Sequence, residues 1–149
     1  MADVETMEHC GMTVPDVREA EEFYENILGA RIDHRSSLRT DELGGTPHTA
    51  IVLGDFFFVL FPHANQPPEP SRPRGFDGTR KAYAVSRDEF QEVVRRLEEH
   101  DVAFDGPKAH PENGPLGESV YFTDPGGNYL EVCWRRDPRP PGKLVSHPR

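Results

Sequence analysis

The same order of sequence signals occurs twice along this chain of 149 residues. In each half, an extended run is followed by a helix start of the form Ser/Asp-x-x-Glu and then by an amphipathic stretch with helical spacing. The two capping boxes begin at Asp16 and at Ser86, and the extended runs before them, His9–Val14 and Arg80–Val85, are 71 residues apart. A repeat of this kind predicts two structural units that each bury one face against the other.

Three further extended runs complete each half, so we expect the order β-α-β-β-β twice. Gly54-Asp55 is typical of a two-residue hairpin turn, and residues 124–127 (Asp-Pro-Gly-Gly) are typical of a tight turn. Aligning Gly54-Asp55 with Gly127-Asn128 sets Phe58 opposite Glu131. The expected strands are Met7–Val14, Ala30–Ser36, His48–Leu53 and Phe56–Phe61 in the first half, and Arg80–Val85, Val102–Asp105, Ser119–Thr123 and Asn128–Trp134 in the second.

We therefore expect an α+β fold in a single domain formed by residues 1–137. Module one spans residues 5–63, and module two spans residues 79–136. Residues 62–78 contain five prolines and are typical of a linker between the modules. Residues 137–149 are rich in proline and basic side chains, which indicates a loose C-terminal tail.

The charge balance excludes several classes of partner. A net charge of -9 and a pI near 5.2 argue against binding to nucleic acid or to an anionic membrane. No stretch approaches the length of a membrane span, and the acidic N-terminus lacks the basic and apolar regions of a signal peptide. Two cysteines, Cys10 and Cys133, fit reduced thiols in a cytosol. We expect a cytoplasmic protein whose partner is a small molecule.

One carboxylate lies in the middle of an apolar strand. Because side chains alternate along a strand, Tyr129, Glu131 and Cys133 point to one side, and the apolar residues between them point to the other. A buried carboxylate is costly unless it is paired, hydrogen-bonded or bound to a metal. Glu131 is therefore the first candidate for a functional residue.

Three segments carry a resemblance to a known protein family: His9–Asp16, the helix end Phe23–Gly29, and Tyr121–Glu131. Together they resemble the vicinal oxygen chelate superfamily, which includes glyoxalase I, fosfomycin-resistance enzymes, extradiol dioxygenases and bleomycin-resistance proteins. The resemblance implies two βαβββ modules that form a curled mixed sheet around an open cavity. It also implies a divalent metal ion held by residues on the first and last strands of each module.

The resemblance implies a set of metal ligands as well. His9 matches the histidine ligand on the first strand, and Glu131 matches the carboxylate ligand on the last strand. Arg80 falls where many members have a second histidine, and Phe58 falls where glyoxalase I has a glutamate. His48 is the best sequence candidate for a third ligand, with a solvent-facing strand end as the competing interpretation. Imidazole and carboxylate ligands suit Fe²⁺, Mn²⁺, Zn²⁺ or Ni²⁺.

The role of Arg80 stays open between three interpretations. In the first, Arg80 pairs with Glu131 in a metal-free pocket. In the second, it binds a substrate carboxylate or phosphate bidentately. In the third, it is a solvated residue at the start of a strand. Tyr121 is a candidate hydrogen-bond donor, with packing as the alternative. We expect Glu131, Arg80 and Tyr121 to carry the chemistry in one cavity that His9 also lines. The histidines expected to face solvent are His34, His63, His100, His110 and His147.

Two classes of function follow. The first is a metal-dependent enzyme of the isomerase, lyase or dioxygenase type, acting on a small organic substrate with adjacent oxygens or an anionic group. The second is a metal-free small-molecule binding or antibiotic-sequestering protein of the bleomycin-resistance type. The extradiol dioxygenase signature is met only in part, because its upstream histidine should lie closer to Val120 than His110 does. In both cases we expect a homodimer.

Overall fold

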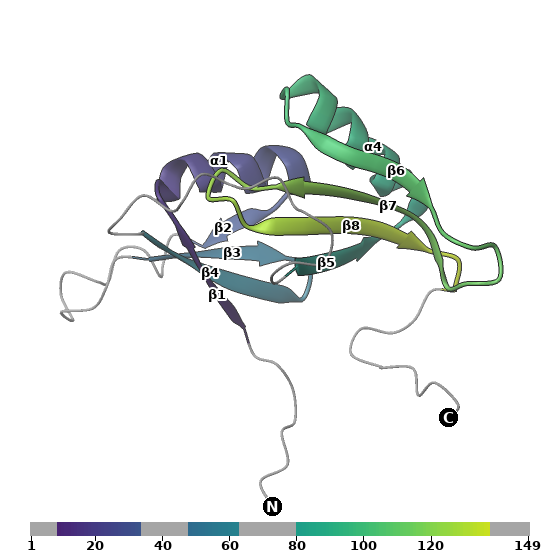
Figure 1. Ribbon diagram of the computed structural model, residues 1–149. Helices are drawn as coiled ribbons and strands as arrows, with labels where there is room; N and C mark the ends of the chain where they lie inside the picture. The colour runs from purple at the N-terminus through teal and green to yellow at the C-terminus, as the bar shows by residue number, and fades with distance from the viewer. Residues whose placement is uncertain (1–8, 34–47, 63–79, 138–149) are drawn as a thin grey trace, which may run out of the picture.

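The computed structural model describes residues 9–33, 48–62 and 80–137, and these form two four-stranded mixed sheets, each with one helix (Figure 1). Within each sheet the first strand is parallel to the last, and the other neighbours are antiparallel. The strand orders are β1-β4-β3-β2 and β5-β8-β7-β6. This confirms the predicted α+β fold with two β-α-β-β-β units. The elements are β1 (Cys10–Val14), α1 (Val17–Leu28), β2 (Arg31–Asp33), β3 (Thr49–Leu53) and β4 (Phe56–Pro62) in module one, and β5 (Arg80–Val85), α4 (Arg87–Glu99), β6 (Phe104–Ala109), β7 (Leu116–Thr123) and β8 (Tyr129–Arg135) in module two.

Both helices begin at the predicted capping residues. The Asp16 carboxylate accepts hydrogen bonds from two backbone N–H groups in the first turn of α1, at 2.9 and 3.1 Å. Ser86 accepts one from the N–H of Glu89 at the start of α4, at 3.1 Å. Helix α1 ends at Gly29, whose φ of 64° is a left-handed conformation that glycine adopts at little cost. The sequence therefore sets the start of both helices and the end of the first.

The strand that differs most from its prediction is β6. It was expected to end at Asp105, but it continues to Ala109 across a bulge between Asp105 and Lys108. Proline at position 107 falls within this bulge, and β6 is the edge strand of its sheet, where a proline removes no ladder hydrogen bond. The expected linker after residue 62 and the expected tail after residue 137 lie outside the described residues.

The register of the sheets corrects the predicted match between Phe58 and Glu131. Glu131 pairs with Ala82, whose counterpart in module one is Gly11, and Gly11 pairs with Val59. Val59 therefore holds the position that corresponds to Glu131, while Phe58 is fully buried in the core. The match failed because two residues connect β3 to β4 but five connect β7 to β8, so the two turns do not align directly.

A buried hydrogen-bond cluster joins the two modules. Tyr24 on α1 donates its hydroxyl to Asp124, in the connection between β7 and β8, over 2.8 Å, and both side chains are buried. Asn128 donates to the same carboxylate through its backbone N–H and its side-chain amide, and that amide also reaches the carbonyl of Thr13 on β1. Burial raises the pKa of the Asp124 carboxyl above its ordinary value. These donors therefore offset the cost of burying a carboxylate.

Each sheet keeps one face on the shared core and turns the other face away from it. The core contains residues of both modules, among them Tyr24, Phe58, Leu97 and Leu130. The two helices also meet, since Arg96 on α4 donates to the carbonyl of Ile27 on α1. No helix among the described residues is long and apolar enough to cross a membrane. We call the two faces turned away from the core the module-one face (His9, His48, Phe57, Val59, Phe61) and the module-two face (Arg80, Lys108, Ser119, Tyr121, Tyr129, Glu131, Cys133).

Candidate functional site

Glu131 on β8 is a buried carboxylate with a partner on each oxygen. Its side chain is only 5% exposed, and its Oε2 lies 2.9 Å from the Nε of Arg80. Its Oε1 accepts a hydrogen bond of 2.7 Å from the hydroxyl of Ser119. The strands set this geometry, because Glu131 lies between Ala82 on β5 and Tyr121 on β7, so that Arg80 and Ser119 reach it from opposite sides. The salt bridge between Arg80 and Glu131, one of the three interpretations left open for Arg80, is present.

His110 extends this cluster by one hydrogen bond. Its Nε2 lies 2.8 Å from the Ser119 hydroxyl, and His110 is half-buried. Because the hydroxyl donates its hydrogen to Glu131, the Nε2 of His110 must carry the hydrogen that it donates to Ser119. The expectation that His110 faces solvent is therefore wrong, since the loop before β7 folds it back onto the module-two face. His100 is exposed as expected.

Two cations and two phenol rings lie on the same face as the carboxylate. The guanidinium carbon of Arg80 lies 5.5 Å from the centre of the Tyr121 ring, and the Lys108 ammonium lies 5.7 Å from it. The rings of Tyr121 and Tyr129 are 6.1 Å apart. Burial raises the pKa of Tyr129, although Arg80 opposes the shift, so Tyr129 is a protonated phenol at neutral pH. Lys108 is also paired with the Asp105 carboxylate. The module-two face therefore offers hydroxyl donors and two ion-paired cations around a fixed carboxylate.

Cys133 belongs to the same face but is not suited to nucleophilic chemistry. The residue is buried, and burial is the main influence that raises the pKa of its thiol, with the charge of Glu131 adding to the shift. The thiolate is the reactive form of cysteine, so a raised pKa keeps Cys133 unreactive. Both cysteines are free thiols, which agrees with the sequence expectation.

The two candidate histidine ligands lie on the other sheet. His9 stacks on Phe57 with ring centres 5.3 Å apart, and His48 lies 5.5 Å from Phe61. The strand register places both histidines on the module-one face. The four residues predicted to line one cavity therefore divide between two sheets: His9 on module one, and Arg80, Tyr121 and Glu131 on module two.

The described donors of one chain do not fit a divalent metal ion. Among the described residues, no three His, Cys, Asp or Glu side chains are grouped so that they could hold one. Both oxygens of Glu131 are engaged by Arg80 and Ser119. An ion bound there would also lie beside the guanidinium, and repulsion between the two cations would cost several kcal/mol at a partly buried site.

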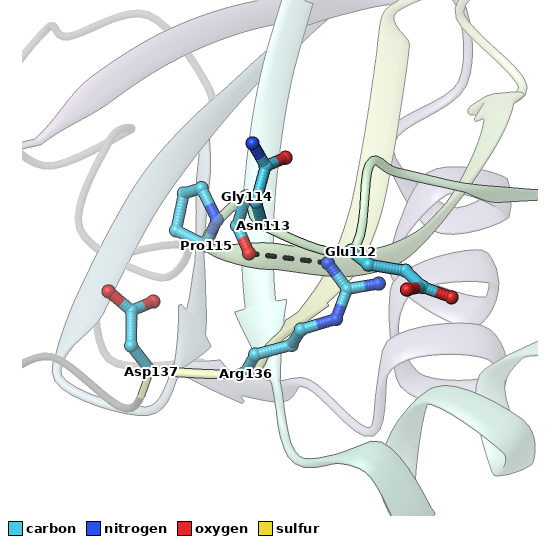
Figure 2. A pocket seen from close by; sticks show the side chains of 6 residues that line it. All are labelled: Glu112, Asn113, Gly114, Pro115, Arg136 and Asp137. Carbon is cyan, nitrogen blue, oxygen red and sulfur yellow. Dashed lines mark hydrogen bonds between the residues drawn. The ribbon is translucent and has the colours of Figure 1, made fainter.

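A hollow lies at the β6–β7 connection, away from the module-two face (Figure 2). It has a volume of about 330 Å³, and its lining shares no residue with the module-two face. Arg136 crosses it and donates to the backbone carbonyls of Pro111, Gly114, Leu116 and His110. These contacts hold the loop that places His110 beside Ser119.

The comparisons with known proteins agree with the fold. The family model of the Glyoxalase/Bleomycin resistance protein/Dioxygenase superfamily matches residues 6–132. The chain belongs to this superfamily. Glutathione transferase FosA from Serratia marcescens is 26% identical over 132 residues, which cover 87% of this chain and 80% of that protein.

Solved structures of the superfamily share the architecture. A glyoxalase/dioxygenase from Nostoc punctiforme superposes with a TM-score of 0.72 at 23% identity, over 89% of this chain and 92% of that chain. A mutant of the fosfomycin resistance protein FosX from Listeria monocytogenes, complexed with Mn(II) and a dihydroxypropylphosphonic acid, superposes with a TM-score of 0.70 at 16% identity, over 89% and 93% of the two chains. The match to the family model confirms the superfamily membership predicted from the three segments.

Sequence reasoning missed three residues of the site. Ser119 could have been found, because it lies two residues before Tyr121 and so shares its face by strand alternation. Lys108 and His110 gave no such signal. Their positions depend on the bulge in β6 and on the loop held by Arg136, neither of which has a periodic pattern.

Proposed function

We propose that this protein is an enzyme that acts on a small organic anion with adjacent oxygens, and that the module-two face is its substrate site. The observation that carries the proposal is the buried carboxylate of Glu131, fixed between Arg80 and Ser119 in an otherwise apolar strand. Superfamily membership and the relationship to a glutathione transferase support an enzyme. The phosphonic acid in the FosX complex is a small anion with adjacent oxygens, which supports this class of substrate.

Each residue has a distinct proposed role. Arg80 binds the anionic end of the substrate through the guanidinium nitrogens that Glu131 does not engage. Tyr121, whose ring faces the Arg80 guanidinium, donates a phenolic hydrogen bond to a neighbouring substrate oxygen. Glu131 takes a proton from, or returns one to, the carbon next to that oxygen, as an isomerase or lyase reaction requires. Ser119 holds the carboxylate in place for this transfer.

A divalent ion stays a prediction for this chain. The superfamily relative FosX holds Mn(II) in its structure, which supports a metal ion as a general feature. For this chain the candidate ions are Fe²⁺, Mn²⁺, Zn²⁺ and Ni²⁺, and the candidate ligands are His9, Glu131 and His48. Because the donors of one chain do not meet, no step of the proposed chemistry depends on the ion.

A second candidate function is metal-free binding of the bleomycin-resistance type. The Arg80–Glu131 ion pair favours this function, because the guanidinium neutralises the carboxylate that would otherwise bind a metal ion. In this case the substrate becomes a ligand that is held and released unchanged. The module-two face is the binding site under both functions.

Nuclear magnetic resonance titration of the isotope-labelled protein tests the proposal. A panel of small organic phosphonates and carboxylates is added beside neutral compounds of the same shape. We expect the anions alone to shift backbone signals of β5, β7 and β8, because the donors and the positive charge lie there. Shifts confined to the hollow lined by Glu112 and Arg136 would refute the assignment. Product signals appearing in the same sample indicate the enzyme, and an unchanged bound compound indicates the binding protein.

We further propose a homodimer in the cytoplasm. The module-one face supports the assembly, because half-buried aromatic rings of Phe57 and Phe61 lie on it beside His9 and His48. Light scattering over a range of protein concentrations is expected to give twice the chain mass. A mass of one chain at the highest concentration would remove the dimer.

A further inference from the structure

The guanidinium of Arg80 occupies the place at Glu131 where the superfamily resemblance led us to expect a metal ion and a second histidine. Its Nε contacts Oε2 of the carboxylate at 2.9 Å. The Glu131 side chain is 5% exposed, whereas that of Arg80 is 34% exposed. Arg80 therefore joins the buried carboxylate to the accessible surface of the site, as a bound ion would.

The remaining donors of Arg80 suit a pair of oxygens. The contact with Glu131 uses Nε, and among the contacts of the described residues none engages the two Nη nitrogens. A guanidinium presents its N–H groups in a planar fork that matches two oxygens on one carbon or phosphorus atom. Tyr121 lies under this fork, and Lys108, which is paired with Asp105, lies over the same ring.

Each oxygen of the buried carboxylate already has one partner from the chain itself. Glu131 receives Arg80 on one oxygen and Ser119 on the other, and His110 supports Ser119 from behind. A divalent ion needs several free acceptors, and the described residues group no three ligands for one. The cation that Glu131 binds in this structure is therefore the Arg80 guanidinium.

We propose that Arg80 replaces the metal ion, so that the site binds a carboxylate or phosphonate group bidentately with no divalent cation. This inference rests on the proposed function, because it names how the same face recognises its substrate. The ligand class is an organic oxyanion with two oxygens on one atom. Its binding depends on the planar fork of arginine and not on positive charge alone.

Calorimetric titration with propylphosphonate and with butyrate tests this inference. The protein is titrated as purified, after exhaustive treatment with a chelator, and after addition of Mn²⁺, and its metal content is measured by elemental analysis. We expect metal far below one ion per chain and the same affinity in all three states. The two probes distinguish phosphonate from carboxylate as the preferred group.

The matched variants are Arg80→Gln, Arg80→Lys and Arg95→Gln. Loss of charge-assisted hydrogen bonds should weaken binding about tenfold or more in Arg80→Gln, and Arg80→Lys should recover only part of it. Arg95 is an exposed helix residue paired with Glu92 and Glu99, so its variant should bind like the parent. If Arg80→Gln is unstable, the double variant Arg80→Gln/Glu131→Gln is titrated in place of the single variant, because it also removes the uncompensated carboxylate.

Two results would overturn the inference, and they are distinguishable. Binding that is lost with the chelator, restored by Mn²⁺ and abolished in Glu131→Gln would show a metal site, while leaving the module-two face as the substrate site. Binding that is equal in Arg80→Gln and Arg95→Gln would place the ligand elsewhere and would remove the proposed function too.

Discussion

Replacing Arg80 with alanine is expected to lower the free energy of unfolding by about 2–4 kcal/mol, although Arg80 is a third exposed. The reason lies in its partner, because the loss of the guanidinium leaves the Glu131 carboxylate buried with Ser119 as its remaining partner among the described contacts. An unpaired buried charge is far more costly than the loss of a surface ion pair. Equilibrium unfolding in urea measures the change.

The reverse substitution supplies the control. Glu131→Gln removes the buried charge and lets Arg80 turn to solvent, so we expect a loss of about 1 kcal/mol or less. In that background, Arg80→Ala should cost little, and the double variant should be more stable than Arg80→Ala alone. An Arg80→Ala loss equal to that of the exposed helix variant Arg95→Ala would contradict the argument.

Replacing Asp124 with alanine is expected to lower the free energy of unfolding by about 3–4 kcal/mol. Asp124 accepts from the Tyr24 hydroxyl and from both donors of Asn128, and its loss leaves the fully buried hydroxyl of Tyr24 without its acceptor. The same change removes the acceptor that orients Asn128, whose side chain contacts the carbonyl of Thr13 on β1. Urea unfolding again gives the magnitude.

A double-mutant cycle isolates the contact between the modules. Tyr24→Phe alone should cost about 1–3 kcal/mol, and the loss in Tyr24→Phe/Asp124→Ala should be well below the sum of the two single losses. Asp105→Ala, at an exposed aspartate paired with Lys108, serves as the matched control and should stay within about 0.5 kcal/mol of the parent. Fully additive losses would show that the Tyr24–Asp124 hydrogen bond does not couple the modules.

Local signals in the sequence predicted the elements well. The capping residues Asp16 and Ser86 begin the helices, and alternation along the strands placed Tyr121 and Glu131 on one face. These features depend on residues only a few positions apart, so a single sequence contains them. The charge of Glu131 in an apolar strand also indicated the carboxylate that the structure buries between Arg80 and Ser119.

Features that depend on distant segments could not be read from the sequence. The match of Phe58 to Glu131 failed because the lengths of two connections differ, and a one-residue shift turns a side chain to the other face of a sheet. His9 and Glu131 belong to different modules and so to different sheets, and whether the two side chains meet depends on how the modules pack. No local pattern encodes that packing.

A crystal structure of the protein grown with a small organic phosphonate tests the central claim most directly. The account predicts phosphonate oxygens within hydrogen-bond distance of the Arg80 Nη nitrogens on the module-two face, with the Arg80–Glu131 contact kept and no metal ion between them. A phosphonate bound to a metal ion on Glu131, with Arg80 turned away, would contradict it.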